Sequence, residues 1–464
     1  MPGVMPQQQG ARQRPGALGG AAARAVTSGQ ARPGEPPYQV GAEIEVAIEG
    51  VAQGGWCVAR PEGLPVLFVR HALPGERVLA RVSEVTAKFA RADAVQVRQA
   101  SPDRVQAPCE HARPGGCGGC DWQHASLAAQ RGLKAAVVSE QLARLAGIDR
   151  EVTVEPLPGD TDGGSGGLGW RTRVQFAVGR DGVAGLRGHR SHDVVDIGDC
   201  LIAHRAVRDL DIPGDEWRGA SAVEVAVGGA DSAENFAVTV VEGGEQPKAT
   251  GNRARRSGGA RRAKPRRTLV EGRPYLAEHA AGRLWQVSAD GFWQVHPAAA
   301  DTLCAAVVEA LAPRPGDTVL DLYCGAGLFV GAVAPLVGSG GAVTGVESDA
   351  AAVRNAGQNL GDQPQVKFLK ADVAQAAAAG DLPPARLVIA DPPRAGLARE
   401  VVAYLTGDAG AGGAERFGYV SCDPATLARD LALLIAGGWD LADLRAFDAF
   451  PMTHHVECLA VLTR

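Results

Sequence analysis

The sequence predicts an α/β fold for residues 297–464, with a Rossmann-like, doubly wound parallel sheet. Three observations predict it: strand-like and helix-like runs alternate, three strand-like runs end in an acidic residue, and the first of them turns through glycines into a helix. An antiparallel β-barrel and a central α+β domain are expected before this part. A chain of 464 residues exceeds what one hydrophobic core supports.

Composition describes a globular protein, with 45% hydrophobic and 21% charged residues. The net charge of -5 argues against a uniformly basic nucleic-acid wrapper but leaves room for a local basic face. Residues 1–36 lack apolar periodicity and are predicted to form a disordered leader, too polar for a secretory or membrane segment. Nine scattered cysteines then favour a reducing cytoplasm, with metal-binding or catalytic thiols and no membrane partner.

The barrel is expected over residues 37–100. Short alternating runs, such as those at 43–48 and 65–69, are separated by turns rich in Gly and Pro. This alternation is typical of a small, OB-like barrel.

The central domain is expected over residues 101–296, with a helix at 127–146 and strands at 173–178 and 222–227. An insertion at 243–268 interrupts it, and its tract 252–267 holds eight Lys or Arg and no acid. A solvated loop is the default interpretation of this tract, with attraction to RNA phosphates as the alternative.

From residue 297 the elements follow one another in α/β order. We expect helices at 298–311, 331–336, 350–360 and 426–435, and strands at 318–323, 342–347, 387–390, 417–420 and 459–462. Chemistry is expected at the carboxyl edge of the parallel strands.

The first strand leads through Asp321, Tyr323 and Gly325 into a helix without the spacing G-x-G-x-x-G, which disfavours pyrophosphate binding. Glu347 ends the second strand, where a carboxylate typically accepts from ribose hydroxyls, and Asp372 follows the third and could meet an adenine amino group. Together these residues resemble class I S-adenosylmethionine-dependent methyltransferases over about 297–464.

Cys422 stands between a strand-like run and a helix start, where the helix N-terminus can lower the pKa of a thiol. Inert packing is the ordinary alternative for a cysteine. Arg394, in Asp391-Pro392-Pro393-Arg394, takes the place where many amino-methylating enzymes carry an aromatic residue, which disfavours amine methylation. A thiolate could instead add to carbon 6 of a uracil and activate carbon 5, with a general base removing the carbon 5 proton. Glu457 is the candidate base, and His454 or His455 could serve by pKa alone.

Four motifs carry a more specific resemblance: Asp-Leu-Tyr-Cys-Gly, Asp-Pro-Pro-Arg, Ser-Cys-x-Pro-x-Thr-Leu-Ala-Arg-Asp and Phe-Pro-x-Thr-x-His-x-Glu. With them, nearly the whole chain after residue 37 resembles the RNA uracil-5-methyltransferase family. The resemblance implies that the barrel is an RNA-binding TRAM domain, with Pro74-Gly75-Glu76 as its typical turn. It further implies a site built from the nucleophile Cys422, the base Glu457, Asp391 against the substrate uracil and Gln294 at the cofactor. Asp423 departs from the family, which usually has Asn after the nucleophile, and an added carboxylate would oppose thiolate formation.

Cysteines form a third constellation, Cys109-x7-Cys117-x2-Cys120 together with Cys200. Four thiolates suit zinc or an iron–sulfur cluster, and spacing alone does not separate the two. Resemblance to the ribosomal RNA branch of the family implies a [4Fe-4S] cluster, while the other four cysteines, Cys57, Cys304, Cys324 and Cys458, are expected in the core.

We therefore expect a monomer that makes 5-methyluridine in structured RNA, with ribosomal RNA favoured over transfer RNA. Two other functions remain open: methylation of an exocyclic amine, and a non-catalytic iron–sulfur protein that binds RNA through a degenerate methyltransferase domain.

Overall fold

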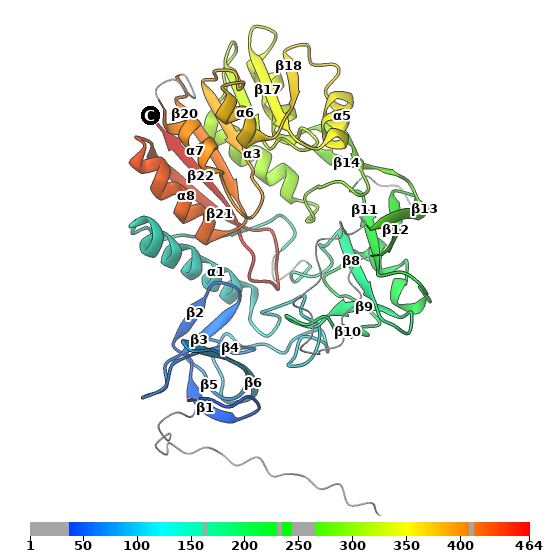
Figure 1. Cartoon of the computed structure of the whole chain (residues 1–464), viewed down its shortest axis with the longest axis vertical. Coiled ribbons are helices and arrows are strands. Elements are labelled where there is room, and N and C mark those ends of the chain that lie inside the picture. The colour runs from blue at the N-terminus through cyan, green and yellow to red at the C-terminus, as the bar shows by residue number, and fades with distance from the viewer. Residues whose placement is uncertain (1–36, 161–164, 230–233, 244–264, 408–412) are drawn as a thin grey trace, which may run out of the picture.

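A computed structural model describes residues 37–160, 165–229, 234–243, 265–407 and 413–464 (Figure 1). The predicted leader and most of the basic insertion lie outside the described residues. Three larger sheets and one hairpin make up the β-structure described.

The first sheet forms the barrel at the lower end of Figure 1. Its order is β1-β5-β6-β4-β3-β2, and it wraps around a core of alternating apolar side chains. The strands are β1 (Glu43–Ala47), β2 (Gly50–Ala52), β3 (Trp56–Ala59), β4 (Val66–Arg70), β5 (Arg77–Val85) and β6 (Phe89–Gln99). All neighbours pair antiparallel except β4 and β6, which are parallel. The predicted antiparallel barrel is thus confirmed with one exception.

A long helix, α1 (Leu127–Gln141), ends in a π-helical turn, η1 (Leu142–Ala146), so the predicted helix at 127–146 is confirmed. Ser126 caps its start by accepting from the backbone N–H of Ala129 at 3.2 Å. The helix contacts β2 of the barrel and helix α8 (Pro424–Ala436), which packs on the third sheet, and in Figure 1 it lies between these two parts.

The second sheet has the order β10-β9-β8-β11-β12-β13 and is antiparallel throughout. Its strands are β8 (Arg173–Val178), β9 (Ala184–Arg187), β10 (Val194–Val195), β11 (Ala222–Val227), β12 (Phe236–Glu242) and β13 (Arg266–Gly272), with short helices α2 (Arg205–Arg208) and η2 (Ile212–Gly214). Strands β8 and β11 match the predicted ranges because apolar residues alternate there on a half-buried face.

The third sheet has eight strands in the order β18-β17-β16-β19-β20-β22-β21-β7. Its strands are β7 (Val154–Pro156), β16 (Thr318–Leu322), β17 (Ala342–Glu347), β18 (Val366–Lys370), β19 (Leu387–Ala390), β20 (Arg416–Ser421), β21 (Asp440–Asp448) and β22 (Glu457–Thr463). The five strands β16 to β20 are parallel, and β22 runs antiparallel beside β20. The predicted parallel sheet is confirmed. The direction in which successive strands are added reverses between β16 and β19.

Helices cover both faces of this sheet (Figure 1). They are α3 (Ala299–Leu311), α4 (Leu328–Val337), α5 (Ala350–Asn359), α6 (Val373–Ala379), α7 (Arg399–Thr406) and α8 (Pro424–Ala436). The hairpin β14 (Tyr275–Ala280) and β15 (Arg283–Ser288) packs on α5. Two apolar clusters, one on each face, form the core.

Strand β7 was not foreseen as part of this sheet, because three residues carry too little pattern to predict. It pairs with β21 and so ties the segment after α1 to the sheet edge. Among the described residues, no helix is both long and apolar enough to cross a bilayer.

Candidate active site and cysteine-lined cavity

Cys422 follows β20 directly and precedes α8, as the sequence predicts. Asp423 is the N-cap of this helix: its Oδ1 accepts from the backbone N–H of Thr426 at 2.8 Å. Pro424 occupies the first helical position, where its missing N–H costs nothing. The thiol is therefore fixed at the junction of a buried strand and a capped helix.

The structure does not support a lowered pKa for this thiol in the free protein. Burial and the nearby charge of Glu457 raise the pKa of Cys422 to about 11, although the guanidinium of Arg394 opposes them by its charge and a hydrogen bond. Desolvation here outweighs the favourable helix terminus. Arg394 limits the rise but does not reverse it, so a bound substrate would have to lower the pKa of Cys422 further for a thiolate to form.

Glu457 and Asp391 face each other across the strand ends. Glu457 opens β22 and is 4% exposed, and Asp391 follows β19. Burial, together with the charge of Asp391, raises the pKa of Glu457 well above its usual range, and burial raises the pKa of Asp391 to about 7. Oε1 of Glu457 has no hydrogen bond to any described residue. A carboxylate that is buried is a stronger base, once it is ionised, than one in water.

Both candidate histidines are engaged by other residues. Nδ1 of His454 is hydrogen-bonded to Asp121 Oδ2 at 2.6 Å, and Nε2 of His455 lies 3.3 Å from Nη2 of Arg394. Burial, with the neighbouring charges of His454 and Arg394, lowers the pKa of His455 to about 3. Glu457 stays the candidate base, since both histidines are held by other side chains.

Cys422, Arg394 and both histidines line a cavity of about 80 Å³, whereas Glu457 and Asp391 are not among its lining residues. Five segments line it: the barrel turn between β2 and β3, helix α1, the Pro-Pro loop after β19, the start of α8 and the segment before β22. The lining residues are Gln53, Gly54, Gly55, Val137, Arg394, Cys422, Asp423, Pro424, His454 and His455. The sequence did not single out the barrel turn, which contributes three of these residues.

The predicted cofactor residues lie at neighbouring strand ends. Asp321 is fully buried in β16, where burial and the charges of Asp391 and Glu347 raise its pKa well above the usual range. Its carboxylate oxygens have no hydrogen bond of good geometry among the described residues. Such an unpartnered buried acid suits a ligand that brings a positive charge or a donor.

The turn after β16 has an unusual backbone conformation. Tyr323 adopts φ 66°, which is unusual for a residue with a side chain, and Gly325 and Gly327 also have positive φ. The backbone N–H of Gly325 donates to Oε2 of Glu347 at 3.2 Å, so the first two strand ends are joined directly.

Asp372 and Gln294 are placed less centrally. Asp372 caps α6 by accepting from the backbone N–H of Gln375 at 2.9 Å. Gln294 is buried in the segment between β15 and α3, and no hydrogen bond among the described residues joins it to the strand-end acids.

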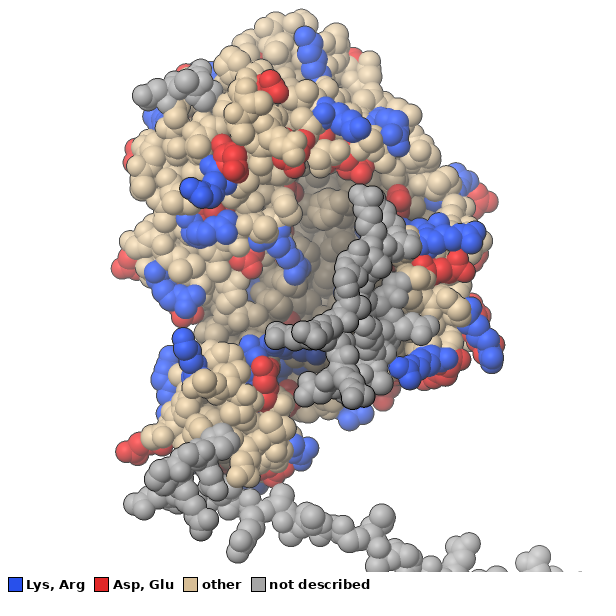
Figure 2. Space-filling view, viewed as in Figure 1, with Lys and Arg blue, Asp and Glu red and all other residues tan. Residues whose placement is uncertain are grey.

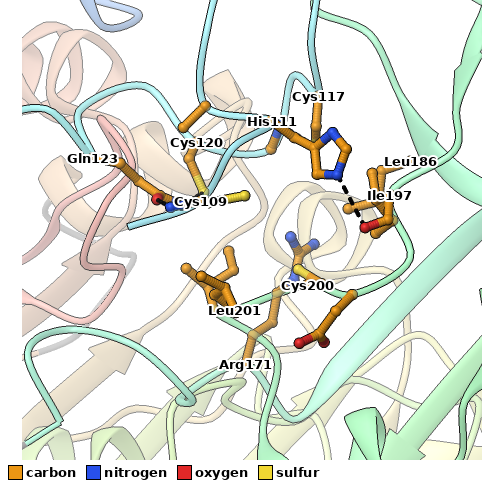
Figure 3. Close-up of a pocket in the computed structure, with 14 residues that line it drawn as sticks. Cys109, His111, Cys117, Cys120, Gln123, Arg171, Leu186, Ile197, Cys200 and Leu201 are labelled. Carbon is orange, nitrogen blue, oxygen red and sulfur yellow. Dashed lines mark hydrogen bonds between the residues drawn. The ribbon is translucent and has the colours of Figure 1, made fainter. Parts of the chain in front are cut away.

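The four predicted cysteine ligands line one cavity (Figure 3). Burial raises the pKa of Cys117, Cys120 and Cys200. The charge of Arg171 opposes this rise at Cys117 and Cys200 but does not reverse it. Gln123 joins two members: its Nε2 donates to Sγ of Cys120 at 3.1 Å, and its Oε1 accepts from the backbone N–H of Cys109 at 3.1 Å. The remaining wall is largely apolar.

These thiols do not form a site for a single metal ion. No group of three or more His, Cys, Asp or Glu in the described part of the chain could hold one. The four cysteines therefore share a cavity but are spread around it. Cys57, Cys304, Cys324 and Cys458 are buried, as predicted.

Three residues that the sequence analysis left without a role support the site. Gln53 contacts Asp423, Asp121 contacts His454, and the fully buried Asp430 accepts from the backbone N–H of Leu397 at 2.8 Å and the hydroxyl of Tyr419 at 2.7 Å. An acid on the apolar face of a helix was a usable signal for Asp430. The other two contacts span more than 300 positions and leave no local signal.

A doubly wound sheet whose strand-end acids adjoin a Pro-Pro loop and a thiol at a helix start defines a class I S-adenosylmethionine-dependent methyltransferase. Comparison with known proteins narrows this class. The family profile described as tRNA (Uracil-5-)-methyltransferase matches residues 276–464, and the TRAM domain profile matches residues 37–95.

Relatives extend the likeness over almost the whole chain. An uncharacterised RNA methyltransferase from Streptomyces coelicolor is 47% identical, covering 92% of this chain and 94% of its own. A 23S rRNA (uracil(1939)-C(5))-methyltransferase from Acidithiobacillus ferrooxidans is 33% identical, covering 90% of this chain and 97% of its own. The chain belongs to the RNA uracil-5-methyltransferase family.

A solved structure shares the fold. It is the tRNA (uracil-54, C5)-methyltransferase of Pyrococcus abyssi in complex with S-adenosyl-L-homocysteine, with a TM-score of 0.63 and 22% identity over 90% of this chain and 100% of that one.

Proposed function

We propose that this enzyme methylates carbon 5 of a uridine in structured RNA through a covalent adduct between Cys422 and carbon 6. We favour 23S ribosomal RNA over transfer RNA as the substrate. The observation that carries the proposal is the meeting of Cys422, Arg394, Asp391 and Glu457 at one strand edge. Methylation of an exocyclic amine requires no thiol, so it would not explain the presence of Cys422 and its charged neighbours at this site.

The first step is addition of the Cys422 thiolate. The Sγ–C6 bond forms while the C5=C6 electrons move toward O4, so carbon 5 becomes a nucleophile. Arg394 supplies the positive charge that favours the thiolate. Asp391 can contact the uracil in either state, because its ionised form accepts from N3–H and its protonated form donates to a carbonyl oxygen.

The second step is removal of the carbon 5 proton after methylation. Ionised Glu457 takes this proton, the C5=C6 bond re-forms, and the Sγ–C6 bond breaks to release the thiolate. Burial of Glu457 makes its carboxylate a stronger base than one in water.

The cofactor site is proposed at Asp321, Tyr323, Gly325, Glu347, Asp372 and Gln294. S-Adenosylmethionine supplies the electrophilic methyl group when bound. The unpartnered Asp321 fits a cationic ligand, and Glu347 is held by Gly325 at the place where ribose hydroxyls are usually accepted.

We further propose that Cys109, Cys117, Cys120 and Cys200 hold a [4Fe-4S] cluster. Soft thiolates suit iron–sulfur and zinc alike, and the four cysteines that line one cavity supply the number of ligands that a four-iron cluster requires. The charge of Arg171, which lines the cavity, would favour an anionic cluster. Visible absorbance and iron analysis of anaerobically purified protein test this, and stoichiometric zinc without iron would overturn it.

The ribosomal substrate is favoured by the named Acidithiobacillus relative and by the cysteine set. The test maps 5-methyluridine by mass spectrometry in ribosomal and transfer RNA from cells with and without the gene. Loss from 23S RNA supports the proposal, whereas loss from transfer RNA alone redirects it. Purified Cys422→Ala should lose methyl transfer but keep cofactor binding, and persistent transfer would refute the covalent mechanism. If the protein binds RNA but does not bind S-adenosylmethionine and does not transfer a methyl group, the non-catalytic alternative is correct.

A further inference from the structure

A second cavity, of about 500 Å³, opens between the barrel and the central sheet. One wall comes from β3 to β6, and the other comes from the glycine turn at 115–116 and the segment 188–195. Figure 2 shows the molecule hollowed between its barrel, its central part and the large sheet. The active-site residues described above do not line this cavity.

Trp56 and Arg91 in the barrel wall and His189 in the opposite wall bring ring and guanidinium planes together. The Arg91 guanidinium carbon lies 5.4 Å from the ring centre of Trp56 and 4.7 Å from that of Phe89. His189 meets Trp56 edge-on at 5.4 Å, and Glu84 pairs with Arg91 at 2.6 Å. Arg91 is thus held as a fixed plane, and such planes and rings stack nucleobases.

Polar groups that can make further hydrogen bonds line the same cavity. The Arg70 side chain is 6% exposed, yet its contacts with Asp121 and the carbonyl of Cys120 are long, at 3.4 and 3.5 Å. Nε2 of His189 has no hydrogen bond to a described residue. Burial raises the pKa of Asp93, a carboxylate 28% exposed. Donors and acceptors are therefore both available to a ligand.

The charges around the cavity balance. The cations are Arg70, Arg91 and Arg190, and the acids are Glu84, Asp93 and Asp193. A phosphate track would need an excess of cations. A flat, neutral ligand with donors and acceptors on its edge fits better.

The cavity is also close to the reaction centre along the chain. The backbone of Gly55 packs so tightly on Asp121 and His454 that a Cβ would lie 2.9 and 3.1 Å from their atoms. Trp56, the next residue, faces the second cavity. The barrel turn at residues 53–56 therefore contributes to both cavities: Gly55 lines the first and Trp56 lines the second.

We propose that this cavity binds an unpaired base of the substrate RNA near the target uridine, stacked against the Trp56–Arg91 wall and read at its edge by Arg70 and Asp93. This inference rests on the proposed function, since it presupposes RNA as substrate.

The test measures binding of a fluorescent, mixed-sequence, single-stranded 12-nucleotide RNA to the full chain without cofactor. Trp56→Ala should weaken binding roughly 5- to 150-fold, the range for loss of one stacked base, and Trp56→Phe should retain most of it. Arg91→Met is a second variant that leaves the rings in place and should also weaken binding. Arg81→Ala is the control, because Arg81 is an exposed residue of the same barrel that pairs with the half-buried Glu43 and does not line the cavity.

Ultraviolet cross-linking with peptide mapping provides a second measurement. Cross-links at Trp56 or His189 support the proposal, whereas unchanged affinity in both cavity variants, or cross-links confined to other segments, overturns it. Methyl transfer by the unaltered protein is measured in parallel. If transfer fails while affinity still depends on Trp56, the proposed function is wrong and the base-binding cavity stands.

Discussion

The side-chain amide of Gln53 in the barrel donates a hydrogen bond of 2.9 Å to Oδ2 of Asp423, the neighbour of Cys422. Asp423 also caps α8 through its other oxygen. Its carboxylate is thus occupied in holding the barrel turn and the helix start together. Glu457, Arg394 and Asp391 are the charges that chiefly shift the pKa of Cys422. Asp423, which departs from the family pattern, is therefore a positioning residue.

Replacing Asp423 separates its shape from its charge. Asp423→Asn keeps a capping oxygen, and Gln53 can rotate its amide to suit, so stability and turnover should change little. Asp423→Ala removes the cap and should cost about 1 kcal/mol of unfolding free energy. Urea denaturation measures both. Equal destabilisation by the two substitutions would show that the charge itself matters.

Arg394 should control the reactivity of Cys422. Because its charge and hydrogen bond lower the pKa of that thiol, Arg394→Met should raise the pKa further and slow alkylation of Cys422 at pH 9 about tenfold for each unit of the rise. Iodoacetamide labelling, followed by mass spectrometry of the Cys422 peptide, measures this. Arg394→Lys should retain most of the rate. Arg399→Met, at the start of α7, is a matched control and should leave the rate unchanged.

Glu457 should make stability depend on pH. Its pKa is raised by burial and by Asp391, so the folded protein keeps a proton that the unfolded chain loses above about pH 4.3. Stability from this group is full below that pH and is lost as pH rises. Glu457→Gln removes the loss, so its melting temperature relative to the unaltered protein should be higher at pH 8 than at pH 5, while methyl transfer is abolished. An equal difference at both pH values would contradict the raised pKa.

Lys134 should hold the segment before Glu457. This fully buried residue of α1 pairs with Asp448 and donates to the carbonyl of Phe450 at 3.0 Å. Lys134→Met leaves Asp448 buried and unpaired, which should cost about 3–5 kcal/mol. Lys134→Met with Asp448→Asn should recover part of the loss, as measured by thermal melting. Greater destabilisation in the double variant would show that the two residues are not coupled.

Local patterns made most of the elements predictable. Strands β8, β11, β17 and β19 occupy the ranges expected from apolar runs, because a buried strand needs such a run regardless of its partners. Cys422 was found for a similar reason, since a strand end followed by Pro at a helix start is visible in a few consecutive residues. The parallel pairing of β4 with β6 and the addition of β7 were not predictable, since pairing partners are chosen by packing across the chain.

The sequence by itself determined the α/β order, the acids at the strand ends and the positions of the thiols, because each depends on residues close together in the chain. Tertiary structure alone decided that burial raises the pKa of Cys422, that Arg394 opposes this shift, and that Gln53 of the barrel contacts Asp423, the neighbour of Cys422. Desolvation and charge coupling depend on distances between segments that lie tens to hundreds of residues apart in the chain. No local pattern records such distances, and they exist only once the three sheets have packed around α1.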